Sequence, residues 1–192
     1  MTANLGPGRP RRKRRYHGSV TRGLLTATAL AAAVVTGVAW ARALDYLSDD
    51  AFISFRYARN LARGAGLVYN PGERVEGYTN FLEVAILAVA HRMGADLVAA
   101  GRGLSLVAAA AGVVLAWALA RRGLRRWPAL ALVAAVLVAV NPYFAAWAGA
   151  GLESTLFAAL LAAAALPLLS AEVTPRRFLA ASAFALLLSL TR

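Results

Sequence analysis

Cysteine is absent from this 192-residue chain, and only nine of its residues are acidic. Without cysteine, the protein has neither disulfide bonds nor a thiolate that could bind a metal or act as a nucleophile. Charged residues make up 16% of the chain and hydrophobic residues 60%, and the mean hydropathy is +0.59. Soluble domains rarely have this composition, which is typical of a polytopic membrane protein. The sequence therefore predicts an all-α, polytopic membrane protein.

The net charge of +12 would favour nucleic-acid binding in a soluble protein. In this chain the basic residues lie mostly in short clusters between apolar runs, which is the pattern that orients membrane proteins. Nucleic acid is therefore not an expected partner, whereas membrane lipids are. Residues 1–18, rich in Gly, Pro and Arg, predict a disordered cytoplasmic tail that touches anionic lipid.

Five apolar runs predict membrane spans, because a bilayer core about 30 Å thick needs roughly 20 apolar residues in a helix. Within one transmembrane module, residues 19–192, the runs cover about 23–44, 97–120, 127–147, 152–170 and 176–192. The last run is still apolar where the chain stops, so we expect the N-terminal part of a longer, truncated protein. A cleaved signal peptide is the weaker alternative for the first run, which is longer than a usual signal core.

The short apolar segment 79–93 decides the predicted topology. It carries Glu83 and His91 and is short for a crossing. Three arginine clusters lie at residues 9–15, 121–126 and 176–177. If 79–93 lies in the membrane interface, all three clusters face the cytoplasm, as the positive-inside rule requires. Residues 45–96 then form one external loop at the outer face of the cytoplasmic membrane, and the N-terminus is cytoplasmic.

Six of the nine acidic residues lie between positions 45 and 83 of this loop. Two of them, Asp49 and Asp50, directly follow the first apolar run. The pair is a candidate general base, in which the second carboxylate orients the first or holds a divalent cation. The alternative is a helix N-cap with a neighbouring carboxylate.

Residues 50–63 predict a second interfacial helix. At 100° per residue, four polar residues share one narrow stripe: Arg56, Arg59, Asn60 and Arg63. The remaining apolar arc is expected to face the membrane, with the arginines at phosphate level. Arg56 or Arg59 could hold the phosphate of a lipid-linked donor. Contact with lipid headgroups is the equally weighted alternative.

Three further residues complete the predicted site. The segment 66–80 has no helical period, and its tyrosines suit contact with a sugar, although a structural lid is the alternative. Tyr78 and Asn80 are accordingly assigned to substrate binding. Glu153 begins a helix after the second external turn. There it either complements the helix dipole or reaches the aspartate pair and completes the site.

Two segments, together about 45 residues, resemble a known family. "DDAFISFRYARNLARGAGLVYNPGERVEGYTN" (49–80) is similar to the first external loop of GT-C glycosyltransferases, in particular the terminal arabinofuranosyltransferases of mycobacteria and related actinobacteria. "AGAGLESTLFAALL" (148–161) resembles their Gly-(Leu/Met)-Glu-(Ser/Thr) segment. Where this chain has Glu83, an aromatic or apolar residue is expected from the family.

The resemblance implies a GT-C fold with two juxtamembrane helices in the first external loop. It also implies an inverting transfer of a sugar, expected to be arabinofuranose, from a polyprenyl-phosphate donor to a cell-envelope glycan. The base of that reaction falls on Asp49 or Asp50.

Other functions stay open at this point. Within the same class, the donor could carry mannose or another hexose. A transporter would place ionisable groups along a path near the membrane midplane, whereas the apolar runs of this chain are almost devoid of them. A non-catalytic membrane scaffold is the remaining alternative.

Overall fold

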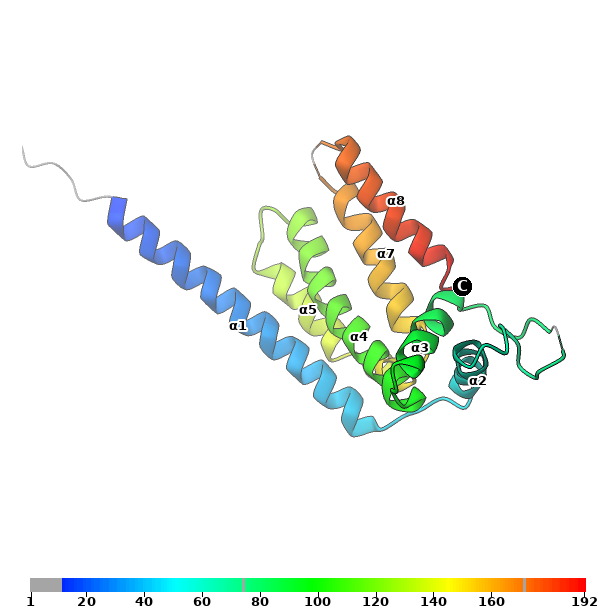
Figure 1. Cartoon of the computed structure of the whole chain (residues 1–192). Coiled ribbons are helices and arrows are strands. Elements are labelled where there is room, and N and C mark those ends of the chain that lie inside the picture. Colours follow the sequence, from blue (N-terminus) through cyan, green and yellow to red (C-terminus); the bar gives the residue numbers. More distant parts are fainter. Residues whose placement is uncertain (1–11, 74, 171) are drawn as a thin grey trace, which may run out of the picture.

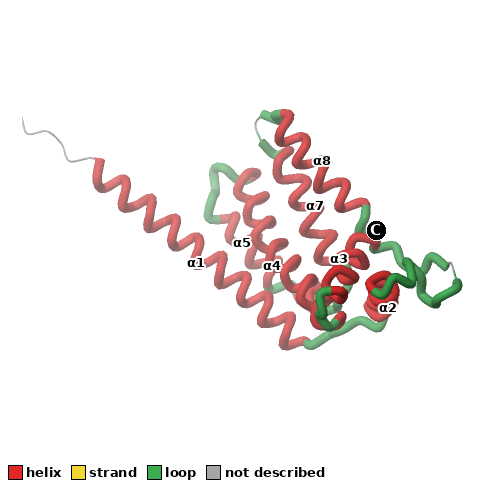
Figure 2. The backbone as a smooth tube through the Cα atoms, viewed as in Figure 1, coloured by secondary structure: helices red, strands yellow, loops and turns green. Residues whose placement is uncertain are grey.

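The computed structural model describes residues 12–73, 75–170 and 172–192, and it describes side chains from residue 21 onward. This part of the chain consists of eight α-helices joined by loops and contains no β-strand (Figures 1 and 2). The all-α prediction is therefore confirmed for the described residues. Of the predicted tail 1–18, residues 1–11 lie outside the described part, and residues 12–18 belong to the first helix.

Helix α4 (Leu97–Gly123) lies at the centre of a helical bundle. Around it pack α1 (Arg12–Leu44), α5 (Leu130–Ala139), α6 (Pro142–Gly149) and α7 (Ser154–Leu168), and α8 (Pro175–Ser189) packs against α7 (Figure 1). Small residues allow α1 to approach its neighbours closely. A Cβ atom on Gly37 would lie 3.3 Å from the carbonyl oxygen of Ala139, and one on Gly149 would lie 3.3 Å from that of Ala41.

Two shorter helices, α2 (Ala51–Ala62) and α3 (Phe81–Arg92), pack together and against α4. They lie at the end of the bundle where α1 ends and α4 begins (Figure 1). The C-terminal end of α8 reaches the same place, because Leu82 N donates a 2.7 Å hydrogen bond to Leu190 O. Both ends of the segment 45–96 therefore lie at one end of the bundle, although its position relative to a membrane stays a prediction.

Two helical segments of the described chain are long and apolar enough to cross a membrane, Thr21–Leu44 and Leu97–Gly123. Helices α5 and α6 add a third if they form one span that is bent by 55°. The bend follows from Pro142, which has no N–H to donate and disfavours helical conformation in the residue before it. Helices α7 and α8 have 15 residues each. Where five spans were predicted, the described chain therefore has two helices able to span a membrane, or three with the bent pair.

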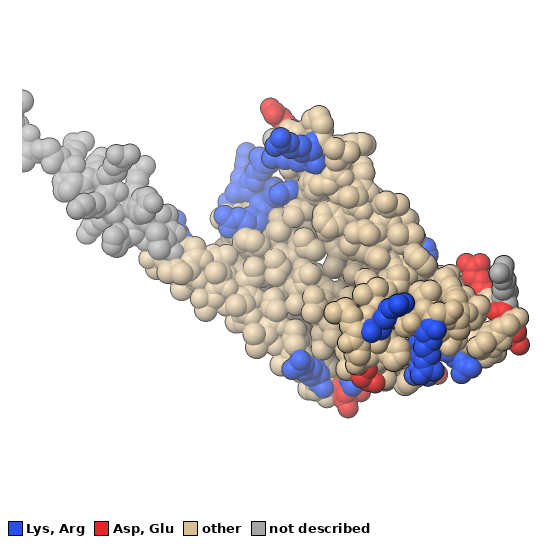
Figure 3. Space-filling model, viewed as in Figure 1, with Lys and Arg blue, Asp and Glu red and all other residues tan. Residues whose placement is uncertain are grey.

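Basic side chains gather at the opposite end of the bundle from α2 and α3 (Figure 3). Arg122, Arg125 and Arg177 line one surface depression, where the α4–α5 connection faces the α7–α8 connection. Arg122 donates to the carbonyl oxygen of Leu166, and Arg177 donates to that of Glu172 at 2.7 Å. Two of the three arginine clusters therefore lie at the same end of the bundle, as the predicted topology requires.

Candidate functional site

Asp49 and Asp50 lie in the short connection between α1 and α2, and both are exposed. The connection is fixed to the turn after α6, because Ser48 N donates a 3.0 Å hydrogen bond to Ala150 O. Asp49 Oδ1 accepts a 3.1 Å bond from the backbone N–H of Asp50. Asp50 is the N-cap residue of α2, yet its side chain makes no capping hydrogen bond. Neither carboxylate forms an ion pair with a described residue, so both are accessible to a ligand.

Arg56 and Arg59 differ in whether their side chains form hydrogen bonds with other described residues. Arg56 donates from Nε to Tyr69 O and from Nη2 to Asn70 Oδ1, each at 2.8 Å, and its guanidinium lies 4.7 Å from the centre of the Tyr69 ring. It therefore holds the loop that follows α2. Arg59 is exposed, and its side chain has no hydrogen-bond or ion-pair partner among the described residues.

The apolar arc of α2 is buried mainly against protein, which differs from the expectation that it faces the membrane. Phe55, Tyr57 and Ala58 are each at most 2% exposed and pack with residues of α3 and α4. Only Phe52 and Ile53 remain exposed. The expectation was wrong for most of the arc because α3 supplies an apolar partner that helical periodicity alone cannot reveal.

The segment between α2 and α3 is held by Tyr57. Its hydroxyl donates to Val75 O at 2.7 Å and accepts from Gly77 N at 2.9 Å. Its ring centre lies 4.8 Å from that of Tyr78. Burial, the nearby Glu76 carboxylate and Tyr57 raise the pKa of Tyr78. Tyr78, predicted to contact substrate, is therefore half-buried and packed against α2.

Three elements converge on the side chain of Asn80, which precedes α3. Its Nδ2 atom lies 2.9 Å from Ser54 Oγ of α2, 2.7 Å from Glu83 Oε2 and 3.1 Å from Glu153 Oε2 at the start of α7. Because an amide carries two N–H bonds, it satisfies two of these three acceptors at a time. Asn80 and Glu153, both predicted site residues, are thus brought together with two residues that the sequence reading did not select, Ser54 and Glu83.

Glu83 is fully buried in this cluster, and α3 lies outside the candidate membrane spans. Burial and the neighbouring Glu153 carboxylate raise the pKa of Glu83 to about 8, although the bond from Asn80 acts in the opposite direction. Its second oxygen, Oε1, has no hydrogen-bond partner among the described residues. A carboxyl group in this state carries a proton at neutral pH. The only sequence signal for Glu83 was an acid within an apolar run.

The aspartate pair and Glu153 lie on neighbouring backbone segments. The Ser48–Ala150 bond joins those segments, and a Cβ on Gly151 would lie 3.0 Å from Leu47 Cδ1 and 3.5 Å from Ala51 Cβ. No side-chain contact joins Glu153 to Asp49 or Asp50 among the described residues, so its role in completing their site stays a prediction. Glu153 instead bonds to Asn80.

No group of three or more His, Asp or Glu side chains in the described part of the chain is arranged to hold a metal ion. A divalent cation at the aspartate pair would therefore need ligands from a substrate or from water. Comparison of the chain with protein-family models, with curated proteins and with solved structures gives no match.

Proposed function

We propose that the chain is part of a membrane glycosyltransferase. It would transfer a sugar, expected to be arabinofuranose, from a polyprenyl-phosphate donor to a cell-envelope glycan at the outer face of the cytoplasmic membrane. The proposal rests on Asp49 and Asp50, which are exposed and form no ion pair with a described residue. They follow shortly after Leu44, where a helix able to cross a membrane ends. A carboxylate near the end of a membrane-spanning helix can contact both a lipid-borne donor and a polar acceptor.

In the proposed reaction, one aspartate accepts the proton of an acceptor hydroxyl. The hydroxyl oxygen bonds to the anomeric carbon while the bond from that carbon to the donor phosphate oxygen breaks. Polyprenyl phosphate leaves with the electron pair of that bond, and the configuration at the anomeric carbon is inverted. The second aspartate orients the base, and the Ser48–Ala150 hydrogen bond fixes the backbone of the segment that carries both carboxylates.

Other predicted residues take supporting roles. Arg59 remains the cation of α2 that is available to the donor phosphate, because Arg56 is committed to the loop. Tyr78 lies on that loop beside Tyr57 and could offer one face of its ring to a sugar. Asn80, which is buried, and Glu153, which is half-buried, form a polar contact between the starts of α3 and α7.

The test is to replace Asp49 and Asp50 singly by Asn in the full-length protein and to measure transfer from a polyprenyl-phosphate pentose in membranes. Loss of a general base typically lowers the rate by about two to four orders of magnitude. We expect both variants to insert normally and lose transfer, with Asp50→Asn the more severe. Glu76→Gln, which neutralises an exposed carboxylate of the same loop, is the control and should retain activity.

Two outcomes would contradict the proposal. If both Asp variants keep near-normal turnover, the pair is only the N-terminal cap of α2. If the unaltered protein transfers neither pentose nor hexose from polyprenyl phosphate, the chain is better explained as a scaffold or transporter component. Transfer of hexose alone would keep the reaction class and change the sugar.

A further inference from the structure

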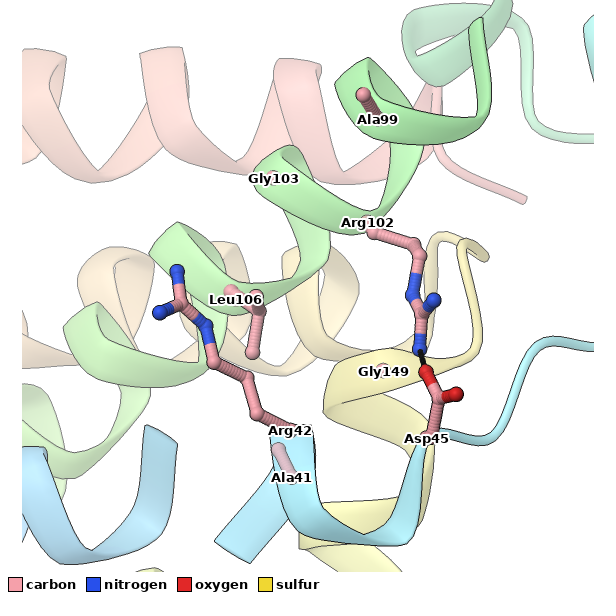
Figure 4. A pocket seen from close by; sticks show the side chains of 8 residues that line it. All are labelled: Ala41, Arg42, Asp45, Ala99, Arg102, Gly103, Leu106 and Gly149. Carbon is pink, nitrogen blue, oxygen red and sulfur yellow. Dashed lines mark hydrogen bonds and ion pairs between the residues drawn. The ribbon is translucent and has the colours of Figure 1, made fainter. Parts of the chain in front are cut away.

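A cavity of about 390 Å³ lies between the C-terminal end of α1 and the first three turns of α4, outside the site described above (Figure 4). Its charged lining residues are Arg42, Asp45 and Arg102, and small residues, among them Gly103 and Gly149, leave the space open. Figure 4 shows the Arg102 side chain extending from α4 toward Asp45, whereas the Arg42 side chain extends from α1 away from Asp45, along the other side of the cavity. The volume falls within the range of small-ligand sites.

The charges in this cavity are unbalanced. Arg102 Nη2 lies 2.5 Å from Asp45 Oδ1, so one arginine is neutralised. The Arg42 side chain has no hydrogen-bond or ion-pair partner among the described residues. The cavity therefore carries one excess positive charge, which fits a singly charged anion.

Helix energetics do not explain why an arginine occupies position 102. Arg102 lies in the second turn of α4, close to the helix N-terminus, where the helix dipole favours negative charge. Its pairing with Asp45 is weakly held, because the Asp45 side chain is 79% exposed and exposed ion pairs contribute little to stability. Asp45 also has a left-handed backbone, φ +46°, which reverses the chain directly after α1. The pair is therefore easily exchanged for another anion.

The cavity lies at the ends of both helices that are long enough to cross a membrane. Beside it, Tyr46 and Trp147 pack edge to face with ring centres 6.4 Å apart, and both are exposed. Exposed tyrosine and tryptophan are enriched at the depth of lipid headgroups. The expected source of an anion at this depth is a lipid.

We propose that this cavity binds the phosphate group of a membrane lipid through Arg102, while Arg42 adds positive charge on the other side of the cavity. Asp45 forms an ion pair with Arg102 when no lipid is bound, and an entering phosphate displaces the Asp45 carboxylate. A phosphodiester headgroup and a polyprenyl phosphate share this chemistry, and either could supply the phosphate. The proposal does not depend on sugar transfer, because none of the three residues belongs to the proposed catalytic pair.

The test measures lipid binding to the purified full-length protein in detergent by native mass spectrometry. The probes are phosphatidylglycerol, a polyprenyl phosphate and uncharged diacylglycerol as the reference. Arg102→Gln should weaken binding of the phosphate lipid by about 10- to 100-fold, the effect of losing a charge-assisted bidentate contact. Asp45→Asn should strengthen binding several-fold, because it removes the competing carboxylate. Arg92→Gln, an exposed arginine at the same end of the bundle, is the matched control.

The opposite signs of the two variants separate a binding site from a structural salt bridge. A purely structural pair would make both variants lower the melting temperature without changing lipid affinity in opposite directions. Unchanged binding in Arg102→Gln, weaker binding in Asp45→Asn, or binding no tighter than that of diacylglycerol would each overturn the proposal. Preference for one phosphate lipid over the other identifies the source of the phosphate.

Discussion

Glu83→Gln is the substitution that most directly tests the buried cluster around Asn80. Glu83 is fully buried, one of its oxygens bonds to Asn80 at 2.7 Å, and the other has no partner among the described residues. Glutamine has nearly the same shape and keeps an acceptor oxygen for Asn80, but it cannot ionise. The substitution therefore removes the titration while leaving most of the packing intact.

The expected magnitude follows from the pKa of Glu83, which rises from 4.5 to about 8 on folding. At pH values below 4.5 the carboxyl group is protonated in both states and folding carries no penalty. Between 4.5 and 8 the unfolded chain ionises while the folded chain does not, so stability is lost as pH rises. The loss is about 3 kcal/mol at pH 7 and about 5 kcal/mol above pH 8.

The assay is denaturant unfolding in detergent micelles, followed by the fluorescence of the four tryptophans between pH 5 and 9. We expect the free energy of unfolding of Glu83→Gln to exceed that of the unaltered protein by a margin that grows from pH 5 to about pH 8 and then levels off. Glu172→Gln, at an exposed carboxylate, controls for other titrations. A margin that stays constant over this range would refute the reasoning, because Glu83 would then be ionised in the folded state and paired with a cation.

Two further predictions concern packing and topology. Gly101→Ala should lower the free energy of unfolding by about 1–3 kcal/mol in the same assay. Its Cβ would lie 2.6 Å from the Phe55 ring, whereas a Cβ on Gly103 meets nothing within 4 Å, so Gly103→Ala should not destabilise the protein. Single cysteines at positions 70 and 124 of this cysteine-free chain should react with an impermeant maleimide from opposite faces, and a reporter fused after Met93 should read as external. Labelling of both cysteines from one face would exclude the predicted topology.

Helix positions were predictable where local signals were strong. The predicted segments 50–63, 79–93 and 97–120 correspond to Ala51–Ala62, Phe81–Arg92 and Leu97–Gly123. The start of α4 is fixed by Asp96, whose side chain accepts a 2.9 Å bond from Ala99 N. Gly94, with φ +95°, ends the preceding segment. Such caps depend on neighbouring residues and can be recognised in the sequence.

Span length was less predictable from hydropathy, because apolar composition does not reveal where a helix stops. The run 127–147 is interrupted at Asn141–Pro142, where Asn141 adopts an extended ψ of 120° and caps α6 by accepting from Phe144 N at 3.0 Å. The sequence contained this signal in its Asn-Pro pair, but the apolar residues on either side concealed it. Helix α7 likewise contains Pro167 one residue before its end.

The candidate site shows why residue type alone could not assign roles. Arg56 lies on the predicted polar stripe of α2, yet it donates hydrogen bonds to Tyr69 and Asn70 of the following loop. Helical periodicity does not predict the position of that loop. In the sequence, Glu83 is an isolated acid in an apolar segment. In the structure, its carboxyl group and that of Glu153, 70 residues later, both accept from the Asn80 amide. Burial of Glu83 beside the half-buried Glu153 carboxylate favours the protonated form of Glu83, since burial penalises its charge and the two carboxylates would repel each other. Burial and long-range partners, which residue type does not reveal, therefore decide that Glu83 is protonated and that Arg56 is structural.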